Sequence, residues 1–449
     1  MKFKIDNQTF KDLDIFDTAQ NGQSVFALFN FTQCLGGKER LRSFLSSPVT
    51  DLTELTERKA AIAYFQKYLP IGLEVDKNSL DFTEFYLKNG SYPTRIVSKA
   101  IAIERKIMDK ISPNSEYYLI EKGVSSTVNL LKSIHQFSLE LSAKFQRSES
   151  YPTLLQKNNE KVLEIFSQPE YEEIINLKKI KAYDTSRLDY LFRYKDRHHI
   201  RFFLSLIYEY DAFRSVAKAA GEYKLSYPEI LPETENRLNI EGLFHPFVEN
   251  AIPNDIHFDG SSNLLFVSGP NMAGKSTFLK ALGICVYLAH VGFPVPASRM
   301  TLSVLSGLCT TINIADNLKS GYSHFYAEVM RIKDVTAELS SNKNMLVIFD
   351  ELFRGTNVKD AYDGTLAIVS AFSRIKSSFF VVSTHIVEVA KELDDNTKIK
   401  FCYFEVDQPD GVPTYTYKLK EGVSDVRLGM YIINKERLIE QINSITDDK

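Results

Sequence analysis

The residues whose types and spacing most clearly indicate a chemical role form the stretch GPNMAGKS, which has the spacing GxxxxGK[ST]. Such a loop holds nucleotide phosphates, because its glycines let the backbone approach and its N–H groups converge on the anion. We predict that Lys275 neutralises the β- and γ-phosphates of ATP, and that the Ser276 hydroxyl binds Mg²⁺. The predicted phosphate-loop contacts are Gly269, Pro270, Asn271, Met272, Ala273, Gly274, Lys275, Ser276 and Thr277.

A second group of candidate residues is the pair of carboxylates that ends the run MLVIFDE. Five apolar residues there predict a buried strand that delivers Asp350 and Glu351 to its end. We expect Asp350 to hold Mg²⁺ and Glu351 to orient or polarise the attacking water. The alternative is an acidic turn with no catalytic role, and the phosphate loop upstream favours the catalytic interpretation.

His385 and Ser323 are further candidates for ATP hydrolysis. His385 follows the predicted strand in SSFFVVST and is either a structural histidine or a contact to the γ-phosphate. An Asp–Glu pair with such a histidine is typical of ATPases of the ABC type, which hydrolyse ATP between two copies of the domain. Ser323 is then either an ordinary helix N-cap or the residue that reaches the partner's γ-phosphate.

The elements that must position these residues divide the chain into two predicted domains. Apolar residues at three- and four-residue spacing predict helices in residues 56–69, 126–145 and 201–220. Beyond the proline-containing segment 226–238, short apolar runs alternate with amphipathic helices, as in a parallel α/β sheet. We therefore predict a multidomain protein with an all-α domain at 1–235 and an α/β P-loop ATPase domain of the ABC type at 236–449.

The composition is that of a globular protein, and its net charge does not indicate a particular class of partner. The formal net charge is −3, so any surface for nucleic acid must be a local patch. The four cysteines are far apart, which favours neither a zinc site nor a disulfide framework, and a reducing cytoplasm fits best. We recognise no signal peptide at the start and no stretch that would span a membrane.

The most basic stretch lies between Asn176 and Arg201, with eight Lys or Arg against three Asp. It is either an arm that contacts DNA phosphates or a solvated helix face. The tentative DNA contacts are Lys178, Lys179, Lys181, Arg193 and Arg197.

Four motifs in order, GPNMAGKST, SHFYAEVMRI, FDELFRGTN and STH, resemble the ATPase domain of the MutS family of DNA mismatch-repair proteins. The asparagine and methionine inside the phosphate loop and the RGT after the carboxylates are characteristic of that family. HPFVENAIPNDI is similar to the lead-in to its nucleotide pocket, where Ile252 is a predicted nucleotide contact and Ala251 stands where an adenine-stacking aromatic is often found. EGVSDVRLGMYI resembles the closing segment before a short dimerisation helix.

The helical half resembles the MutS core and lever helices, in residues 24–65 and 207–223. The resemblance implies a homodimeric, Mg²⁺-dependent, DNA-binding ATPase of mismatch repair or a related repair or recombination process, with repair proteins as partners. The family's mismatch-binding domain would have to precede residue 1, so direct mismatch recognition is not expected. The competing interpretations are a nucleotide-switched scaffold that binds proteins and a P-loop kinase of small molecules.

Overall fold

The structure is a computed structural model. It describes residues 2–16, 23–68, 76–88, 98–111, 114–145, 151–258, 261–312, 324–393, 396–407, 412–424 and 429–447. Two compact units divide the chain. One contains Met1–Leu28, Leu45–Thr56 and Glu222–Lys449, and the other contains Phe29–Phe44 and Glu57–Gly221. We call them the α/β unit and the helical unit.

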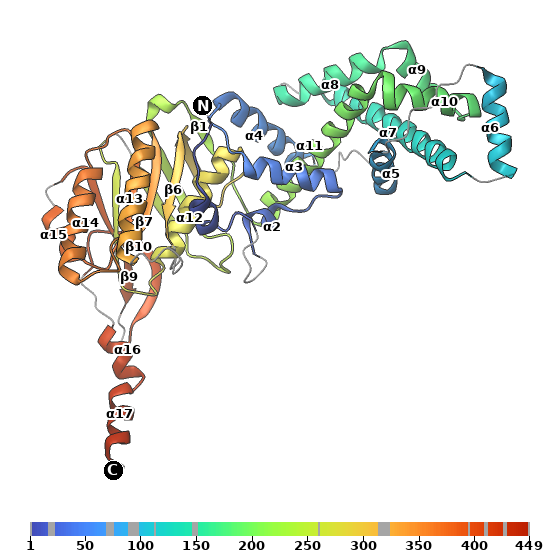
Figure 1. Cartoon of the computed structure of the whole chain (residues 1–449). Helices are drawn as coiled ribbons and strands as arrows, with labels where there is room; N and C mark the ends of the chain where they lie inside the picture. Colours follow the sequence, from blue (N-terminus) through green and yellow to red (C-terminus); the bar gives the residue numbers. More distant parts are fainter. Residues whose placement is uncertain are drawn as a thin grey trace. The chain divides into compact units, whose positions relative to one another are not determined.

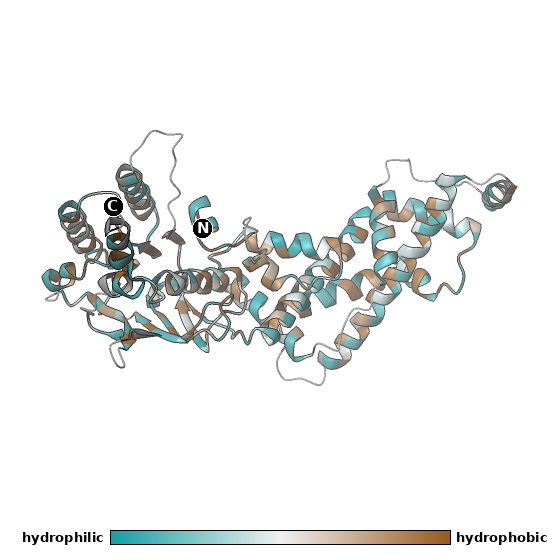
Figure 2. Cartoon of the chain, turned by 90° about the horizontal axis from the view of Figure 1, so that it is seen from below, coloured by the Kyte–Doolittle hydropathy of each residue, from teal (hydrophilic) through white to brown (hydrophobic). Residues whose placement is uncertain are grey.

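The helical unit is built from amphipathic helices, whose apolar and polar residues are interleaved in Figure 2. In its longest helix, Val124, Val128, Leu131 and Leu141 are buried at the spacing that one helix face requires. The predicted helices at 126–145 and 201–220 are confirmed as parts of α7 and α11, and the one at 56–69 is confirmed as far as Lys67, where α4 ends. The helices α3, α4 and α11 each extend slightly beyond the residue ranges of this unit. Its elements are α3 (Leu35–Ser46), α4 (Leu52–Lys67), α5 (Lys77–Lys88), α6 (Lys99–Ile111), α7 (Ser115–Phe145), α8 (Thr153–Phe166), α9 (Pro169–Asn176), α10 (Ala182–Tyr190), a π-helical turn (Leu191–Lys195) and α11 (Arg197–Glu222).

The α/β unit contains two sheets with helices around them (Figure 1). The larger sheet has the order β10-β9-β4-β8-β7-β6, and all its neighbours are parallel except β9 and β10. The smaller sheet has the order β1-β5-β2-β3. The strands are β1 (Glu229–Leu231), β2 (Leu238–Leu243), β3 (Asn254–Phe258), β4 (Leu264–Ser268), β5 (Arg299–Ser303), β6 (Gly307–Thr311), β7 (Met345–Asp350), β8 (Phe379–Ser383), β9 (Ile399–Asp407) and β10 (Thr414–Glu421).

The helices of this unit cover both faces of the larger sheet. Alternate residues of a strand point to opposite faces, so Phe266, Val347 and Val382 join one core that α13, α14 and α15 close. The strands β4, β7 and β8 are fully buried, as the apolar runs predict. The helices are α1 (Asn7–Asp12), α2 (Val25–Phe29), α12 (Lys275–Val291), α13 (His324–Ser341), α14 (Val358–Phe372), α15 (Glu388–Leu393), α16 (Gly429–Lys435) and α17 (Leu438–Asp447), with a 3₁₀ turn at Glu233–Glu235.

The first residues of the chain belong to the α/β unit, where they cover the edge strand β6. Lys4 N–H donates to Ser306 O at 2.8 Å, and Leu308 N–H donates to Lys4 O at 2.9 Å. Farther along β6, the Asp12 carboxylate accepts hydrogen bonds from the Thr310 hydroxyl and the Ile312 N–H. An open edge would leave these backbone groups unpaired, so the amino-terminal segment completes the sheet.

The division of the chain thus differs from the predicted boundary after residue 235. The proline-containing segment 226–238 holds β1, which pairs with β5 inside the α/β unit. Pro228 and Pro232 lie just before and just after β1, so neither interrupts the strand. The structure also places residues 1–28 in the α/β unit and not in an all-α domain. The prediction was wrong there because local sequence patterns do not reveal a long-range pairing such as that of Lys4 with Gly307.

None of the helices in the described ranges is both long enough and apolar enough to cross a bilayer.

Candidate nucleotide site

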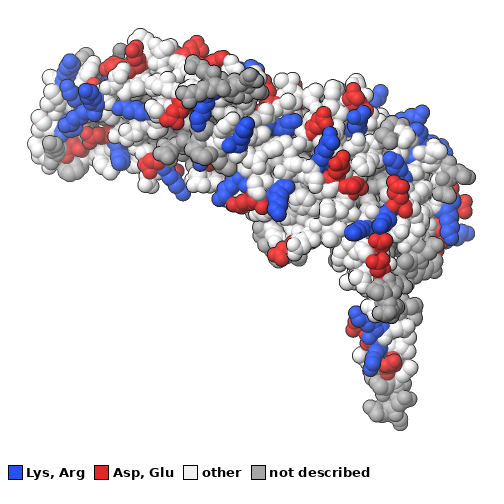
Figure 3. All heavy atoms as spheres, turned by 180° about the vertical axis from the view of Figure 1, so that it is seen from behind, with Lys and Arg blue, Asp and Glu red and all other residues white. Residues whose placement is uncertain are grey.

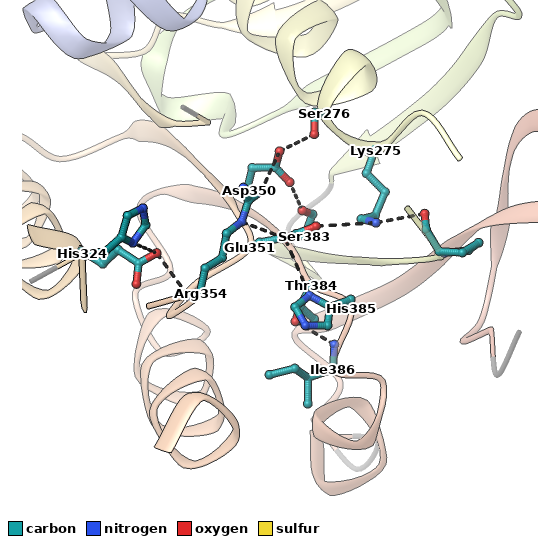
Figure 4. Close-up of polar contacts among 12 residues, drawn as sticks. Lys275, Ser276, His324, Asp350, Glu351, Arg354, Ser383, Thr384, His385 and Ile386 are labelled. Atoms are coloured by element: carbon teal, nitrogen blue, oxygen red, sulfur yellow. Dashed lines mark hydrogen bonds and ion pairs between the residues drawn. The ribbon is translucent and has the colours of Figure 1, made fainter. Parts of the chain in front are cut away.

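Three neighbouring parallel strands bring the predicted site residues together. The strands β4, β8 and β7 lie side by side, and their carboxyl ends lead respectively to the phosphate loop, to His385 and to the carboxylate pair. The register pairs Asp350 with Ser383, so these two side chains share one level of the sheet. Figure 4 shows Lys275, Asp350, Glu351 and His385 converging on this edge.

The phosphate loop contains backbone conformations that glycine adopts easily and other residues rarely adopt. Gly269 and Gly274 have φ values of 143° and 102°, in the left-handed region, and Met272 joins them at 68°. The loop leads into α12, which begins at Lys275. The positive end of α12 therefore lies at Lys275, the predicted phosphate-binding lysine.

Lys275 is held by the loop that precedes it. Its Nζ donates to the carbonyls of Gly269 at 2.8 Å and Pro270 at 3.1 Å, and lies 3.9 Å from Glu351 Oε1. Burial lowers the pKa of Lys275, against the opposing effect of the Glu351 and Asp350 carboxylates. Because Glu351 also pairs with Arg354, at the shorter distance of 2.8 Å, the buried ammonium of Lys275 suits an anionic ligand such as a phosphate.

The residues predicted to bind Mg²⁺ are adjacent. The hydroxyls of Ser276 and Ser383 both donate to Asp350, whose side chain is almost fully buried. Hydroxyl and carboxylate oxygens are the ligands that Mg²⁺ prefers, usually alongside nucleotide phosphates. The residues present therefore fit the ion. Ser383 could not be predicted as a site residue, because a serine at the end of an apolar strand is not distinctive until the pairing with β7 is known.

Glu351 is positioned by the side chains of Arg354, Lys275 and His385 and by a strained backbone. Its Oε2 lies 2.8 Å from Arg354 Nε and 3.7 Å from His385 Nδ1. The contact with His385 is the largest influence that lowers the pKa of Glu351. Burial opposes it, while Arg354 and Lys275 add to the lowering. With φ at 54°, Glu351 occupies a left-handed conformation that non-glycine residues rarely adopt and that is often found at functional sites.

A pocket of about 480 Å³ adjoins the phosphate loop and has the size of a small-molecule site. Ile252 lies on its wall as predicted, next to Ala251. Tyr417 on β10 is one of the aromatic residues of the wall and was not predicted from the sequence. Tyr417 is 47% exposed, and a Cβ on Gly274 would lie 3.2 Å from its ring. An exposed aromatic side chain thus faces the pocket from a strand distant in sequence.

Local structure explains how Tyr417 reaches the pocket. The pairing of β9 with β10 shifts register between Tyr415 and Leu419, and Tyr417 has a φ of 56°. Asn254 fixes this irregularity, because its amide donates to Tyr417 O at 3.0 Å and accepts from Leu419 N–H at 2.7 Å. A regular strand would aim the side chain elsewhere, so the sequence alternation gives no hint of it.

Two other predicted sites have different outcomes. Ser323 lies outside the described residues, although α13 begins directly after it at His324. Arg193 is wrong as a DNA contact, because its side chain is 4% exposed and its guanidinium pairs with the buried carboxylate of Asp189 at 2.6 Å. The spacing of the basic residues gave no sign of this burial.

The remaining basic candidates, Lys178, Lys179, Lys181 and Arg197, are exposed. Lys178 and Lys179 line a pocket of about 410 Å³ together with Lys122 and Lys132 of α7. On the face drawn in Figure 3, basic and acidic side chains of the described residues are interspersed and form no continuous basic stripe.

Comparison with known proteins narrows the class of protein. A parallel sheet with a GxxxxGK[ST] loop at one strand end and carboxylates at another is the arrangement of P-loop nucleotide-binding proteins. The family model for MutS domain V matches residues 265–447, which contain the phosphate loop, the carboxylate pair and His385.

Relatives extend the similarity beyond that domain. The DNA mismatch repair protein MutS of Petrotoga mobilis is 24% identical over 522 aligned positions, covering 95% of this chain and 62% of the relative. The MutS proteins of Bacillus pumilus and Shouchella clausii are 29% and 30% identical, over 52% and 53% of this chain. Residues 265–447 thus match MutS domain V, and the chain as a whole is similar to MutS proteins. It spans 27% to 62% of the length of these relatives.

Proposed function

We propose that this chain is a Mg²⁺-dependent ATPase that works as a homodimer. The observation that carries the proposal is the convergence of Lys275, which follows β4, with Asp350 and Glu351 at the end of β7, on either side of β8. Lys275 would bind the β- and γ-phosphates, and Ser276 and Asp350 would hold Mg²⁺. When bound, Mg²⁺ neutralises charge that develops on the phosphates.

Glu351 is the proposed residue that activates water. Its pKa is lowered, chiefly through His385, so its carboxylate is ionised at neutral pH and can accept a proton or orient a water molecule. His385 lies beside it, and its largely exposed side chain is free to approach a γ-phosphate. In this proposal Ser323 reaches the nucleotide of the partner copy.

The homodimer is supported by the carboxyl-terminal helix α17. Its apolar residues Leu438, Ile439 and Ile442 are 45%, 51% and 60% exposed. Apolar groups on one short helix are more stable when a second surface covers them. Closure of two ATPase heads on ATP and their reopening after hydrolysis would then move the helical units.

The hydrolysis proposal predicts a separation of binding from turnover. Replacing Glu351 with Gln should leave ATP affinity nearly unchanged but lower the rate of hydrolysis by roughly a hundred- to a thousandfold, as loss of a transition-state contact typically does. Equilibrium binding and phosphate release measure the two quantities. Retention of more than about a tenth of the turnover would reject this role for Glu351. A product phosphorylated on a small molecule would instead favour a kinase.

We further propose that the helical unit binds DNA through exposed basic side chains near Lys178 and Lys179. Changing Lys178, Lys179 and Lys181 to Gln should weaken binding to duplex DNA and reduce the salt slope by about 0.9 for each phosphate that the variant no longer neutralises. Lys333→Gln, on the exposed face of α13, is the matched control and should change nothing. Absence of binding to duplex, branched and mismatched DNA at about 50 mM salt would reject the proposal and favour a protein-binding scaffold.

A further inference from the structure

The helix α13 makes a contact with the catalytic loop that the proposed function does not use. Glu328, in the second turn of α13, is 5% exposed, and its Oε1 accepts a hydrogen bond from the Arg354 N–H at 3.2 Å. Burial raises the pKa of Glu328, while the N–H groups of Arg354 and Gly355 and the nearby His324 oppose that rise. A buried carboxylate from one element therefore holds the backbone of another.

The packing around this contact is tight. A Cβ on Gly355 would lie 2.6 Å from the backbone nitrogen of Phe325 and 3.0 Å from the Cβ of His324. The rings of Phe325 and Phe353 are 5.6 Å apart. The first turn of α13 thus rests directly on residues 353–355, and neither can shift without the other.

Arg354 carries the connection onward to Glu351. Its backbone N–H is held by Glu328, and its Nε lies 2.8 Å from Glu351 Oε2 (Figure 4). A pocket of about 190 Å³ lies between them, lined among others by Glu328, Asp350 and Glu351. The space beside the catalytic carboxylate is therefore bounded by α13.

The same helix is anchored one turn farther along. Arg331 donates to the Thr310 carbonyl at 2.7 Å and to the Thr311 hydroxyl at 3.1 Å, and it pairs with Asp6. Arg331 thus fixes α13 to β6. Glu328 lies three residues before Arg331, between this anchor and the amino end of the helix, so a displacement of that end would move Glu328. The left-handed backbone at Glu351 and Phe353 makes the loop sensitive to such a displacement.

We propose that Glu328 is a positioning residue that couples the amino end of α13 to Glu351. Its hydrogen bond holds the Arg354–Gly355 backbone in the position from which the Arg354 side chain contacts Glu351, and so sets Glu351 for water activation. This inference rests on the proposed ATPase function.

The test compares Glu328→Ala and Glu328→Gln with Asp334→Asn, which removes an exposed carboxylate from the same helix. We expect Glu328→Ala to lower kcat by roughly ten- to a hundredfold with KM for ATP unchanged, as loss of a positioning contact does. Glu328→Gln keeps one acceptor oxygen for the Arg354 N–H and should lose less. Asp334→Asn should behave as the wild type.

A second readout separates coupling from general damage. Wild-type turnover per chain should rise with protein concentration as dimers form. In Glu328→Ala the dimers should still form with ATP, as light scattering reports, but turnover should no longer rise with them. The inference is overturned if kcat of Glu328→Ala stays within about twofold of the wild type, or if ATP binding and dimer formation fall in parallel with turnover. If Glu328→Ala does not fold, the same criteria apply to Glu328→Gln.

The proposed function and this inference fail in different ways. Absence of ATP hydrolysis by the wild type would reject the proposed function. The contact itself would still be tested by amide hydrogen exchange, because the N–H groups of Arg354 and Gly355 should exchange faster in Glu328→Ala than in the wild type. Unchanged exchange at these amides would overturn the inference whatever the activity.

Discussion

At the scale of single residues, the ionisation and the burial of a charged side chain depend on its neighbours in the fold. Glu351 is ordinary as an acid after a strand, but beside His385, Arg354 and Lys275 it becomes a carboxylate that stays ionised. Arg193 shows the opposite case. It stands in the most basic part of the sequence, yet it is a buried partner of Asp189 and also contacts the ring of Tyr86. The charged residue type alone therefore did not tell which residue belongs to the candidate site and which is buried as a structural ion pair.

Tyr417 offers a prediction about the base of the nucleotide. Replacing Tyr417 with Ala should weaken ATP binding by roughly 5- to 150-fold, because stacking a base on an aromatic ring contributes about 1–3 kcal/mol. Tyr417→Phe keeps the ring and should bind ATP like the wild type. Isothermal titration gives both affinities.

The control for this prediction is inorganic tripolyphosphate, which has no base. Its affinity should be the same in the wild type and in Tyr417→Ala, because Lys275 and the loop are intact. Equal weakening of ATP and tripolyphosphate would show that the substitution damages the phosphate loop, and the assignment of Tyr417 to the base would then be wrong.

At the scale of elements, the amino-terminal segment and α13 support the edge of the sheet from which the site is built. The carboxylate of Asp12 is 1% exposed as a residue and satisfies two donors at the end of β6, the Thr310 hydroxyl at 2.8 Å and the Ile312 N–H at 2.9 Å. Thr311 and Ile312 in turn line the small pocket beside Glu351. Residues near the start of the chain thus support the edge of the sheet beside the candidate site.

Asp12→Ala should therefore destabilise the α/β unit by about 2–5 kcal/mol, because two buried donors each lose their acceptor at a cost of about 1–3 kcal/mol. Urea unfolding measures the change, and Asp334→Ala, at an exposed position, should stay within about 0.5 kcal/mol of the wild type. An effect of Asp12→Ala no larger than that of the control would contradict this account of the β6 edge.

At the scale of the whole molecule, stability should depend on pH through a buried histidine. His290 lies inside the α/β unit, where Nδ1 faces the Val286 carbonyl and Nε2 faces the Leu305 N–H, both at 2.9 Å. A carbonyl only accepts and an N–H only donates, so the ring must be neutral, with its proton on Nδ1. Burial lowers the pKa of His290 from 6.5 to about 4.

The sign of the effect follows from proton binding. Between pH 6.5 and 4 the unfolded chain binds a proton at His290 that the folded chain does not, so stability is full above pH 6.5 and falls as the pH drops toward 4. At pH 5 the loss from this residue should be roughly 2 kcal/mol. Urea midpoints at pH 7.5 and 5 measure it.

The matched variants are His290→Asn, which has a donor and an acceptor but no titration, and His257→Asn at an exposed position. The first should flatten the pH dependence even if its stability at pH 7.5 is lower. The second should keep the wild-type dependence. If His290→Asn loses as much stability between pH 7.5 and 5 as the wild type does, His290 is not the group responsible.

The local parts of this protein could be predicted from its sequence alone. The spacing GxxxxGK[ST], the apolar runs before Gly269 and Glu351 and the three- and four-residue periodicity of α4, α7 and α11 are short-range patterns. They follow from the rise of a strand, the turn of a helix and the freedom of glycine, and these are properties of neighbouring residues. The family resemblance rests on the same short motifs.

Which distant residues meet became clear only from the packed fold. The order β4-β8-β7 brings Lys275 to Glu351, the irregular pairing of β10 aims Tyr417 at the pocket, and the pairing of Lys4 with β6 adds the start of the chain to the α/β unit. These contacts depend on sheet order, register and burial, which local periodicity does not encode. For the same reason, Arg193 could be assigned to the interior, and Glu328 to the catalytic loop, only once the elements around them had packed.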